Sequence, residues 1–512
     1  IYTLSLHDAL PISSLSWRGG PGSMIVAGAD TRGKSEEFVT MGVLRVERSV
    51  RSGSSQSRCS QSRSSQANPA GERLRLEIAG LSSDGSGIAR TDRGVVFVAG
   101  ALPGELVEAE LVKRRKDFAL ARTMSVVRPS PGRTVPRCSA FGQCGGCQLQ
   151  HADYPLQLSL KAGLVRDAMT RLGGFAPELF ENLECVPSPL PWGYRNKASF
   201  PVQSLRGRIV TGFYHAGSHR LIPIKTCPVN AAPLNALYGT VLKGLPSLPF
   251  GGYDEATHEG KLRHLVMRSG FHTGQTLLSF VLNGRLAAKG IKALVAVGAA
   301  GRPSTLTLNH NSRPGNVILG THTEPLIGSG RIAERLDEWT LEFDTTSFFQ
   351  VNTGQAEQLF RYAAEQVRGT DVLELYSGVG SLTCFLASRA CGARVTAVEE
   401  WRSAVAMAER NMRTNGLEAR LLCARAEEAV GDLRGSYGTV VVDPPRDGCD
   451  RAVLEAIHAF RAPRVVYVSC NPATLARDAR ILAGHGYRLT SIRSFDMFPQ
   501  TVHVETVAVL ER

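Results

Sequence analysis

Long apolar runs are what this sequence lacks, and it has few cysteines for its length. No stretch of about 18 uncharged apolar residues, the length that a membrane-spanning helix needs, occurs in the chain. Ile1 to Pro11 is mildly apolar but lacks the basic start of a signal peptide. The 11 cysteines among 512 residues are too sparse and uneven for a secreted disulfide scaffold. We therefore expect a cytoplasmic protein with no membrane partner.

Acidic residues are also outnumbered. The chain has 46 Asp and Glu against 59 Lys and Arg, a formal net charge of +13. An excess of this size suits a polyanionic partner, although a basic protein without a nucleic-acid role stays open on charge alone. The length allows two to four domains, and no obligate protein partner is inferred.

Residues 1–71 differ in composition from the rest of the chain. The sequence begins at Ile1, and Arg51 to Gln66 is a tract of Ser, Arg and Gln that cannot build a core. The opening IYTLSLHDALPISS resembles a translated sequencing adapter. We therefore expect a disordered or artefactual leader, with the true start at Met24 or Met41.

Short strands separated by glycine turns follow in residues 72–130. Leu74, Leu76 and Ile78 alternate with charged residues, and Val95–Val98 and Glu105–Val112 read as further strands. This spacing predicts a small barrel. The pattern D-G-x-G-I-A-R, a strand and then P-G-E resembles the TRAM domain, an OB-like RNA-binding barrel. Lys113-Arg114-Arg115-Lys116 would be its basic edge, unless this run is only a solvated loop.

A cysteine cluster opens the next region, residues 131–340. Cys138, Cys144 and Cys147 follow a C-x5-C-x2-C pattern with Gly-Gly between the last two. Cys227, in Lys-Thr-Cys-Pro, is the candidate fourth ligand. Four thiolates suit zinc or a [4Fe-4S] cluster. The glycine spacer and the Cys-Pro pair favour iron–sulfur, with zinc and unrelated free cysteines as the alternatives.

The same region alternates strands and helices and predicts an α/β domain. Arg263–Arg268 and Leu277–Leu282 read as strands, and Ala287–Val297 reads as a helix. Several basic residues look exposed, namely Arg195, Lys197, Arg206 and Arg208.

The strongest pattern lies in residues 341–512. A buried strand, Asp371–Leu375, leads into a turn with Gly378 and Gly380, and Glu399 follows at the end of the next strand. Glycines allow a ligand to approach the backbone, and an acidic residue about 20 positions on can bind ribose hydroxyls. Thr383 replaces the third glycine of the dinucleotide pattern. The strand ending in Asp443-Pro444-Pro445-Arg446 then favours S-adenosylmethionine (SAM) over a dinucleotide.

A thiol ends another buried strand. Val465–Ser469 runs into Cys470, and Asn471-Pro472 stops the strand. Open α/β sheets place their chemistry at this edge, so we interpret Cys470 as a nucleophile. Three other cysteines are interpreted as core packing, namely Cys384, Cys391 and Cys423, and Cys185 is interpreted as structural.

Five motifs together resemble the RNA 5-methyluridine methyltransferases of the TrmA/RumA type. They are F-F-Q-V-N from Phe348, L-E-L-Y-S-G-V-G from Leu373, V-D-P-P-R from Val442, S-C-N-P-A-T-L-A-R-D from Ser469 and F-P-Q-T-x-H-V-E from Phe498. The barrel and cysteine cluster make the chain most similar to the 23S ribosomal RNA uracil-C5 branch. The resemblance implies a class I SAM-dependent, Rossmann-like methyltransferase domain behind a central α/β domain and the barrel.

The resemblance also assigns roles by position. It makes Cys470 the nucleophile and Glu505 the general base. Ser381 stands where many members have Asn. The positions matched to SAM binding are Gln350, Tyr376, Gly378, Gly380, Ser381, Glu399 and Asp443; those matched to the [4Fe-4S] cluster are Cys138, Cys144, Cys147 and Cys227.

The expected function is methyl transfer from SAM to C5 of a uridine in RNA, through a covalent bond between Cys470 and uracil C6. Uracil C5 is too weak a nucleophile until a thiolate adds at C6, and the C5 proton must then leave to a base. A transfer RNA substrate and a non-catalytic RNA-binding iron–sulfur protein are the alternatives. A cytosine-C5 enzyme would typically carry a second cysteine within Val442–Pro445, where none occurs.

Overall fold

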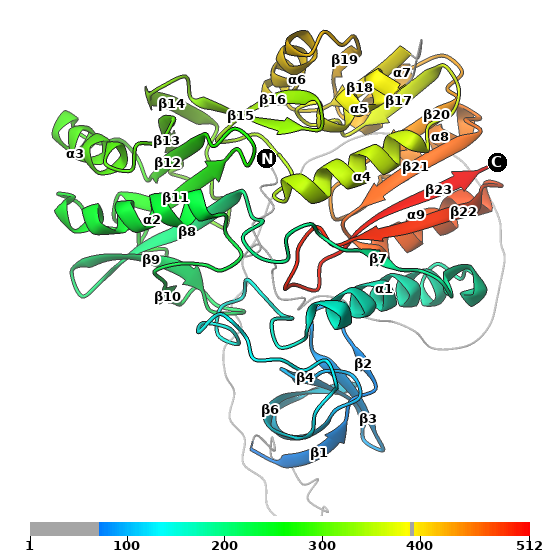
Figure 1. The fold of residues 1–512 in the computed structure, drawn as a ribbon, viewed down its shortest axis with the longest axis horizontal. Helices are drawn as coiled ribbons and strands as arrows, with labels where there is room; N and C mark the ends of the chain where they lie inside the picture. The colour runs from blue at the N-terminus through cyan, green and yellow to red at the C-terminus, as the bar shows by residue number, and fades with distance from the viewer. Residues whose placement is uncertain (1–70, 390–393) are drawn as a thin grey trace, which may run out of the picture. The chain divides into compact units, whose positions relative to one another are not determined.

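The computed structural model describes residues 71–389 and 394–512 (Figure 1). The predicted leader therefore lies outside the described residues except for Gly71, as does Cys391. Three large sheets and one two-stranded hairpin organise the described part of the chain.

The amino-terminal sheet has six strands in the order β1-β5-β6-β4-β3-β2. Apolar side chains alternate along its strands and share one core, which includes Leu76, Val98 and Val107. The TRAM-like prediction of short strands separated by glycine turns is thus met. The strands are β1 Arg73–Glu77, β2 Gly80–Leu81, β3 Gly87–Thr91, β4 Gly94–Ala99, β5 Leu106–Arg114 and β6 Phe118–Arg128.

The central sheet has seven strands in the order β10-β9-β8-β11-β12-β13-β14. Leu234 and Leu237 of helix α2 and Leu294 of helix α3 pack in one core with its strands. The bounds are β8 Lys197–Leu205, β9 Arg208–Tyr214, β10 Leu221–Pro223, α2 Ala232–Gly244, β11 Leu262–Ser269, β12 Thr276–Leu282, α3 Ala288–Ala299, β13 Thr305–His310 and β14 His322–Ile327. The hairpin of β15 (Arg331–Leu336) and β16 (Trp339–Asp344) follows.

The carboxyl-terminal sheet has eight strands in the order β19-β18-β17-β20-β21-β23-β22-β7. β17 to β21 are parallel, and β23 lies antiparallel between β21 and β22. The strands are β17 Asp371–Leu375, β18 Arg394–Glu399, β19 Arg420–Cys423, β20 Thr439–Val442, β21 Arg464–Ser469, β22 Arg488–Phe495 and β23 Glu505–Glu511.

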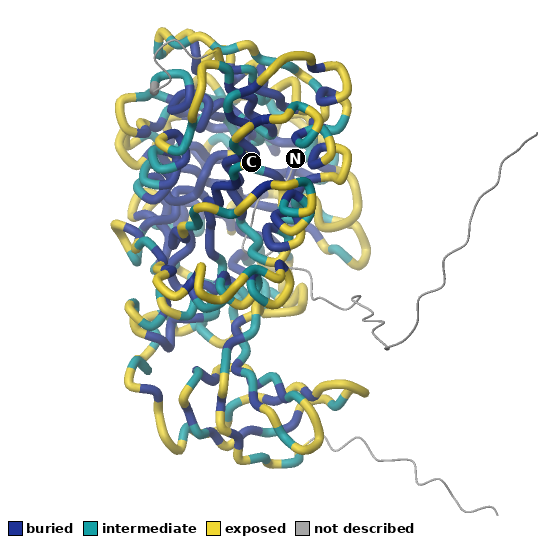
Figure 2. Tube along the Cα trace, turned by 90° about the vertical axis from the view of Figure 1, so that its right-hand side faces the viewer, coloured by how far each residue is buried: buried dark blue, intermediate teal, exposed yellow. Residues whose placement is uncertain are grey.

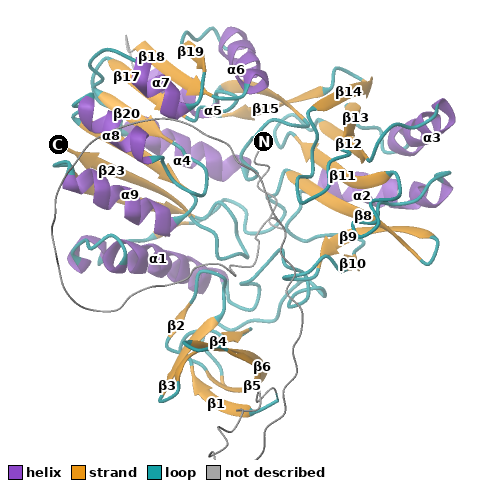
Figure 3. Cartoon of the chain, turned by 180° about the vertical axis from the view of Figure 1, so that it is seen from behind, coloured by secondary structure: helices purple, strands orange, loops and turns teal. Residues whose placement is uncertain are grey.

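Helices cover both faces of this sheet, and the strands are buried between them (Figures 2 and 3). Val440 and Val442 join the core of one face, whereas Val441 joins that of the other, as a period of two requires. The sheet is therefore doubly wound. The first face is covered by α1 Tyr154–Arg171, α7 Ala426–Asp432, α8 Arg451–Ala459 and α9 Pro472–Gly484, the second by α4 Thr353–Glu365, α5 Ser381–Arg389 and α6 Arg402–Thr414.

One segment predicted to belong to the central domain packs elsewhere. Val165 and Met169 of α1 lie in the same core as α9, and β7 (Cys185–Val186) pairs with β22 at the edge of the carboxyl-terminal sheet. Cys185 is buried there, as its structural interpretation requires. Residues 154–186 thus contribute to the doubly wound sheet.

Candidate active site and cysteine cluster

The G-x-G turn lies between β17 and α5. Tyr376, Gly378 and Gly380 all have positive φ, at 67°, 58° and 82°. A Cβ on Gly380 would lie 3.1 Å from the Cβ of Ala408 in α6, so both the backbone conformation and the close contact require glycine. Ser381 then begins α5.

Glu399 joins this turn from the end of β18. Its carboxylate accepts hydrogen bonds from the backbone N–H of Gly378 (2.9 Å) and of Trp401 (2.9 Å). Burial raises the pKa of Glu399, while these two amides oppose the shift. The structure therefore places Glu399 against the glycine turn.

Two further carboxyl groups lie at neighbouring strands. Burial raises the pKa of Asp443, which follows β20, to about 7. Burial also raises the pKa of Glu374, on β17, to about 8, and the charges of Asp443 and Glu399 add to the shift. These groups form one acidic cluster at the carboxyl ends of the parallel strands, and Glu374 was missed by the sequence analysis although it lies within L-E-L-Y-S-G-V-G.

Cys470 and Glu505 are brought together by strand pairing. Cys470 follows β21 and Glu505 begins β23, and Ser469 pairs with Thr506 between these antiparallel strands. Continuing that register by one residue sets Cys470 opposite Glu505. Glu505 is almost fully buried.

The charges around this pair act on both groups. Burial, followed by the carboxylates of Glu505 and Asp443, raises the pKa of the Cys470 thiol, and Arg446 opposes the shift. Burial and Asp443 likewise raise the pKa of Glu505, again opposed by Arg446. It is therefore costly for Cys470 and Glu505 to be ionised together, and the Arg446 cation favours the state in which one of them is ionised. The sequence analysis quoted Arg446 in V-D-P-P-R without giving it a role.

Asn471 fixes the chain immediately after the cysteine. Its side chain caps α9 by accepting from the N–H of Ala473 (3.1 Å), and it donates to the carbonyl of Arg446 (3.0 Å). The predicted strand stop is thus also the cap of a helix. It joins the segment carrying Cys470 to the segment carrying Arg446.

The segment before α4 connects the site to the central domain. Gln350 is buried, and its backbone carbonyl accepts from the side chain of Asn196 (2.9 Å). Asn352 caps α4 and donates to Ser188 (2.9 Å) and to the carbonyl of Met497 (3.2 Å).

Helix α1 holds the loop that leads into Glu505. Lys161 and Asp496 form a fully buried ion pair, and Lys161 also donates to the carbonyl of Phe498 (2.9 Å). Gln157 exchanges two hydrogen bonds with Gln500, of 3.0 and 2.9 Å. The motif F-P-Q-T-x-H-V-E could have indicated Gln500, whereas nothing local indicates its partner 343 residues away.

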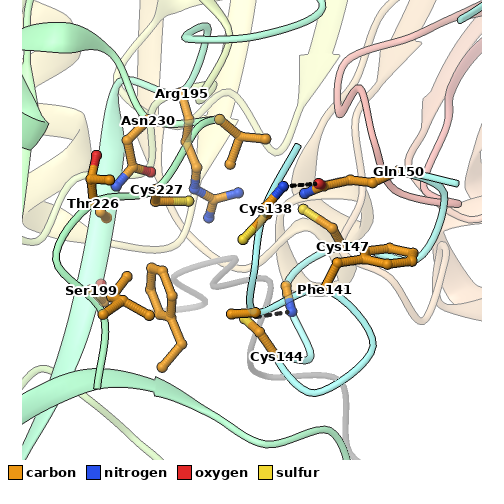
Figure 4. Close-up of a pocket in the computed structure, with 16 residues that line it drawn as sticks. Cys138, Phe141, Cys144, Cys147, Gln150, Arg195, Ser199, Thr226, Cys227 and Asn230 are labelled. Atoms are coloured by element: carbon orange, nitrogen blue, oxygen red, sulfur yellow. Dashed lines mark hydrogen bonds between the residues drawn. The ribbon is translucent and has the colours of Figure 1, made fainter. Parts of the chain in front are cut away.

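The four cysteines of the predicted cluster line one cavity (Figure 4). It encloses about 590 Å³ of space, counting open solvent at its mouth. The loop with Cys138, Cys144 and Cys147 lies opposite the segment with Cys227 (Figure 4). The structure therefore brings together the four cysteines that the sequence analysis grouped.

Burial dominates the electrostatics of these thiols. Burial raises the pKa of the Cys144 thiol to about 11. It also raises the pKa of Cys227, and there the backbone amides of Val229 and Asn230 and the charge of Arg195 oppose the shift. Arg195 lines the same cavity, and its buried Nη1 has no hydrogen-bond partner. Donors and a cation thus surround the sulfurs, the environment that thiolates bound to a metal require.

Three predictions about side-chain exposure were wrong. Arg195 and Lys197 are buried, because the segment leading into β8 is covered on both sides, whereas Arg206 and Arg208 are exposed as expected. Cys423 is exposed because β19 is the edge strand of its sheet. Cys384 is buried, as predicted for a core residue.

The doubly wound sheet, with its glycine turn, acidic strand ends and antiparallel β23, defines a SAM-dependent methyltransferase fold. Residues 329–512 match the tRNA (Uracil-5-)-methyltransferase family, and residues 70–123 match the TRAM domain. No helix among the described residues is long and apolar enough to span a membrane.

Relatives extend the match over most of the chain. An RNA methyltransferase of Gloeobacter violaceus is 43% identical over 454 residues, which cover 86% of this chain and 97% of that protein. One of Thermosynechococcus vestitus is 40% identical, covering 86% and 98%. The crystal structure of the Pyrococcus abyssi tRNA (uracil-54, C5)-methyltransferase with S-adenosyl-L-homocysteine has a TM-score of 0.68 at 29% identity and covers 85% of this chain and 100% of that one. The chain belongs to the TRAM-containing RNA uracil-5 methyltransferase family.

Proposed function

We propose that this enzyme methylates C5 of a uridine in ribosomal RNA, with Cys470 as a covalent nucleophile. The observation that carries the mechanism is the cross-strand position of Cys470 opposite Glu505, beside Arg446. One thiol and one carboxyl group are the two groups that the reaction at C5 needs.

The residues of the pair act in sequence. The Cys470 thiolate adds to C6, and the electron pair of the C5–C6 double bond moves toward C5 and O4. SAM, when bound, supplies the methyl group that C5 takes. Glu505, as a carboxylate, then accepts the C5 proton, the double bond re-forms and the thiolate leaves C6. Before attack the negative charge of the pair lies on the Cys470 thiolate, which Arg446 stabilises, and Glu505 is protonated. Glu505 loses its own proton to solvent once the thiolate charge has moved onto the uracil ring, so it is a carboxylate when the C5 proton leaves.

The acidic cluster and glycine turn are proposed to hold the methyl donor. Glu399 is placed to accept from the ribose hydroxyls, and the positive-φ turn at Gly378 and Gly380 leaves the backbone open to the ligand. Asp443 lies near the Cys470 thiol, at the edge of the sheet where the methyl donor would bind. Gln350, Tyr376 and Ser381 complete the proposed set.

We propose that the cysteine cavity holds a [4Fe-4S] cluster. Such a cluster is held by four Cys thiolates, and all four cysteines line this cavity. The buried Arg195 Nη1, which has no hydrogen-bond partner among the described residues, suits the negative charge of the cluster. Iron and sulfide analysis should find four of each per chain, lost in Cys144→Ser; a colourless protein with stoichiometric zinc would reject the cluster.

A transfer RNA remains the second candidate substrate, because the Pyrococcus abyssi relative is a tRNA (uracil-54, C5)-methyltransferase. We incubate the purified protein with labelled SAM and unmodified ribosomal or transfer RNA in separate reactions, then identify the nucleoside after digestion. We expect 5-methyluridine in the ribosomal RNA. Labelled 5-methylcytidine would reject uracil chemistry, and label confined to transfer RNA would reject the ribosomal substrate alone.

A further inference from the structure

A second metal-type constellation lies on the central sheet, away from the cysteines. His310 ends β13, and His322 and Glu324 begin β14. Their nitrogen and oxygen ligand atoms all lie within 4.8 Å of one another, the one such trio of His, Cys, Asp or Glu in the described ranges. We propose that these three residues form a surface site for a divalent transition-metal ion such as Zn²⁺.

Strand pairing explains why the three side chains meet. His310 is directly opposite His322 in the antiparallel pair β13–β14, and their rings stack with centroids 5.6 Å apart. Glu324 is two residues beyond His322 and therefore lies on the same face of the sheet. β14 is the last strand of the sheet, so the site opens at an edge.

The hydrogen bonding of His310 orients one ring nitrogen toward a metal. Nδ1 lies 3.4 Å from the carbonyl of Gly284, to which it can only donate. In the neutral ring Nε2 is then an acceptor, and it faces the Glu324 carboxylate oxygen at 3.0 Å. A metal ion can bridge these two atoms with His322 as the third ligand, whereas a proton would bridge only the two of them. A ligating histidine that donates its other nitrogen to a backbone carbonyl is the usual arrangement at metal sites.

The donor set selects the kind of ion. Two imidazoles and one carboxylate suit Zn²⁺ and its transition-metal neighbours, whereas Mg²⁺ and Ca²⁺ prefer oxygen alone. Three protein ligands leave a fourth position, and the side chains of His310 and Glu324 are 24% and 44% exposed. Water can therefore complete the coordination.

The test measures Zn²⁺ binding to the full-length protein whose cysteine cavity is already filled. We expect one additional Zn²⁺ per chain by calorimetric titration, and its affinity should fall at least roughly 10-fold in His322→Ala and in Glu324→Gln. Electron paramagnetic resonance of Cu²⁺ at this site should show two coupled nitrogens, reduced to one in His322→Ala. Unfolding midpoints verify that these surface variants fold.

His485→Ala is the matched control, because His458 and His485 also stack, at 4.4 Å, but form no such trio with a carboxylate. It should leave the additional binding unchanged. Equal Zn²⁺ binding by the wild type and His322→Ala would overturn the proposal. So would the absence of any additional Zn²⁺ binding by the wild type.

Discussion

Replacing Lys161 by Met should destabilise the protein by about 3–5 kcal/mol, because it leaves the Asp496 carboxylate buried and unpaired. Neither side chain of this pair is exposed to solvent. Lys161 also donates to the carbonyl of Phe498, which would keep only Thr501 as its donor. The loop from Asp496 to Glu505 would then be held to α1 by the Gln157–Gln500 hydrogen bonds without the ion pair, so methyl transfer should fall with stability.

The double variant Lys161→Met/Asp496→Leu tests whether the cost of the single variant comes from the unpaired Asp496 charge. Removing both charges leaves no buried ion, so its free energy of unfolding should lie within about 1 kcal/mol of the wild type or above it. Urea denaturation followed by circular dichroism measures all three proteins. Arg451→Met is the control, since it breaks an exposed pair with Glu455 and should cost at most about 0.5 kcal/mol. A Lys161→Met cost below about 1 kcal/mol, or a double variant as unstable as the single one, would refute the reasoning.

Three other substitutions test the site. Gly380→Ala should cost about 1–3 kcal/mol and weaken SAM binding in calorimetry, whereas Gly416→Ala, with positive φ but open space, should leave SAM affinity unchanged. Arg446→Gln removes the cation that lowers the Cys470 pKa, so the rise of kcat with pH should move to higher pH; an unmoved profile contradicts this role. The pKa of Glu374 is about 8 in the folded protein, above its unfolded value, so its contribution to the free energy of unfolding is lost as pH rises toward 8. In denaturation curves from pH 5 to 9, Glu374→Gln should lose less stability with rising pH than the wild type. An equally steep loss in the variant would contradict the raised pKa of Glu374.

The sequence predicted the position of those site residues that lie at the end of a single strand. Glu399, Asp443 and Cys470 each end a buried strand, and parallel strands bring such ends to one edge of a sheet. Residue type and local spacing also grouped the four cysteines that line one cavity. The role of Glu505 came only from the family resemblance, and its position opposite Cys470 came only from the structure, since pairing between distant strands leaves no local pattern.

Long-range packing accounts for what was missed. Nothing in the sequence around Lys161 and Gln157 indicates that they are buried, because their partners lie in a loop more than 300 residues away. Arg195 looked exposed because local sequence does not reveal what covers it. Cys423 looked buried because local sequence does not distinguish an edge strand from a central one.

The central claim is that Cys470 forms a covalent bond to uracil C6 and that Glu505 removes the C5 proton. The most direct measurement uses Glu505→Gln with SAM and unmodified ribosomal RNA, followed by nuclease and protease digestion and mass spectrometry. The account predicts an accumulated peptide containing Cys470 linked to one methylated uridine, which is absent from the Glu505→Gln/Cys470→Ala double variant. A link at another residue, or full turnover by Cys470→Ala, would contradict it.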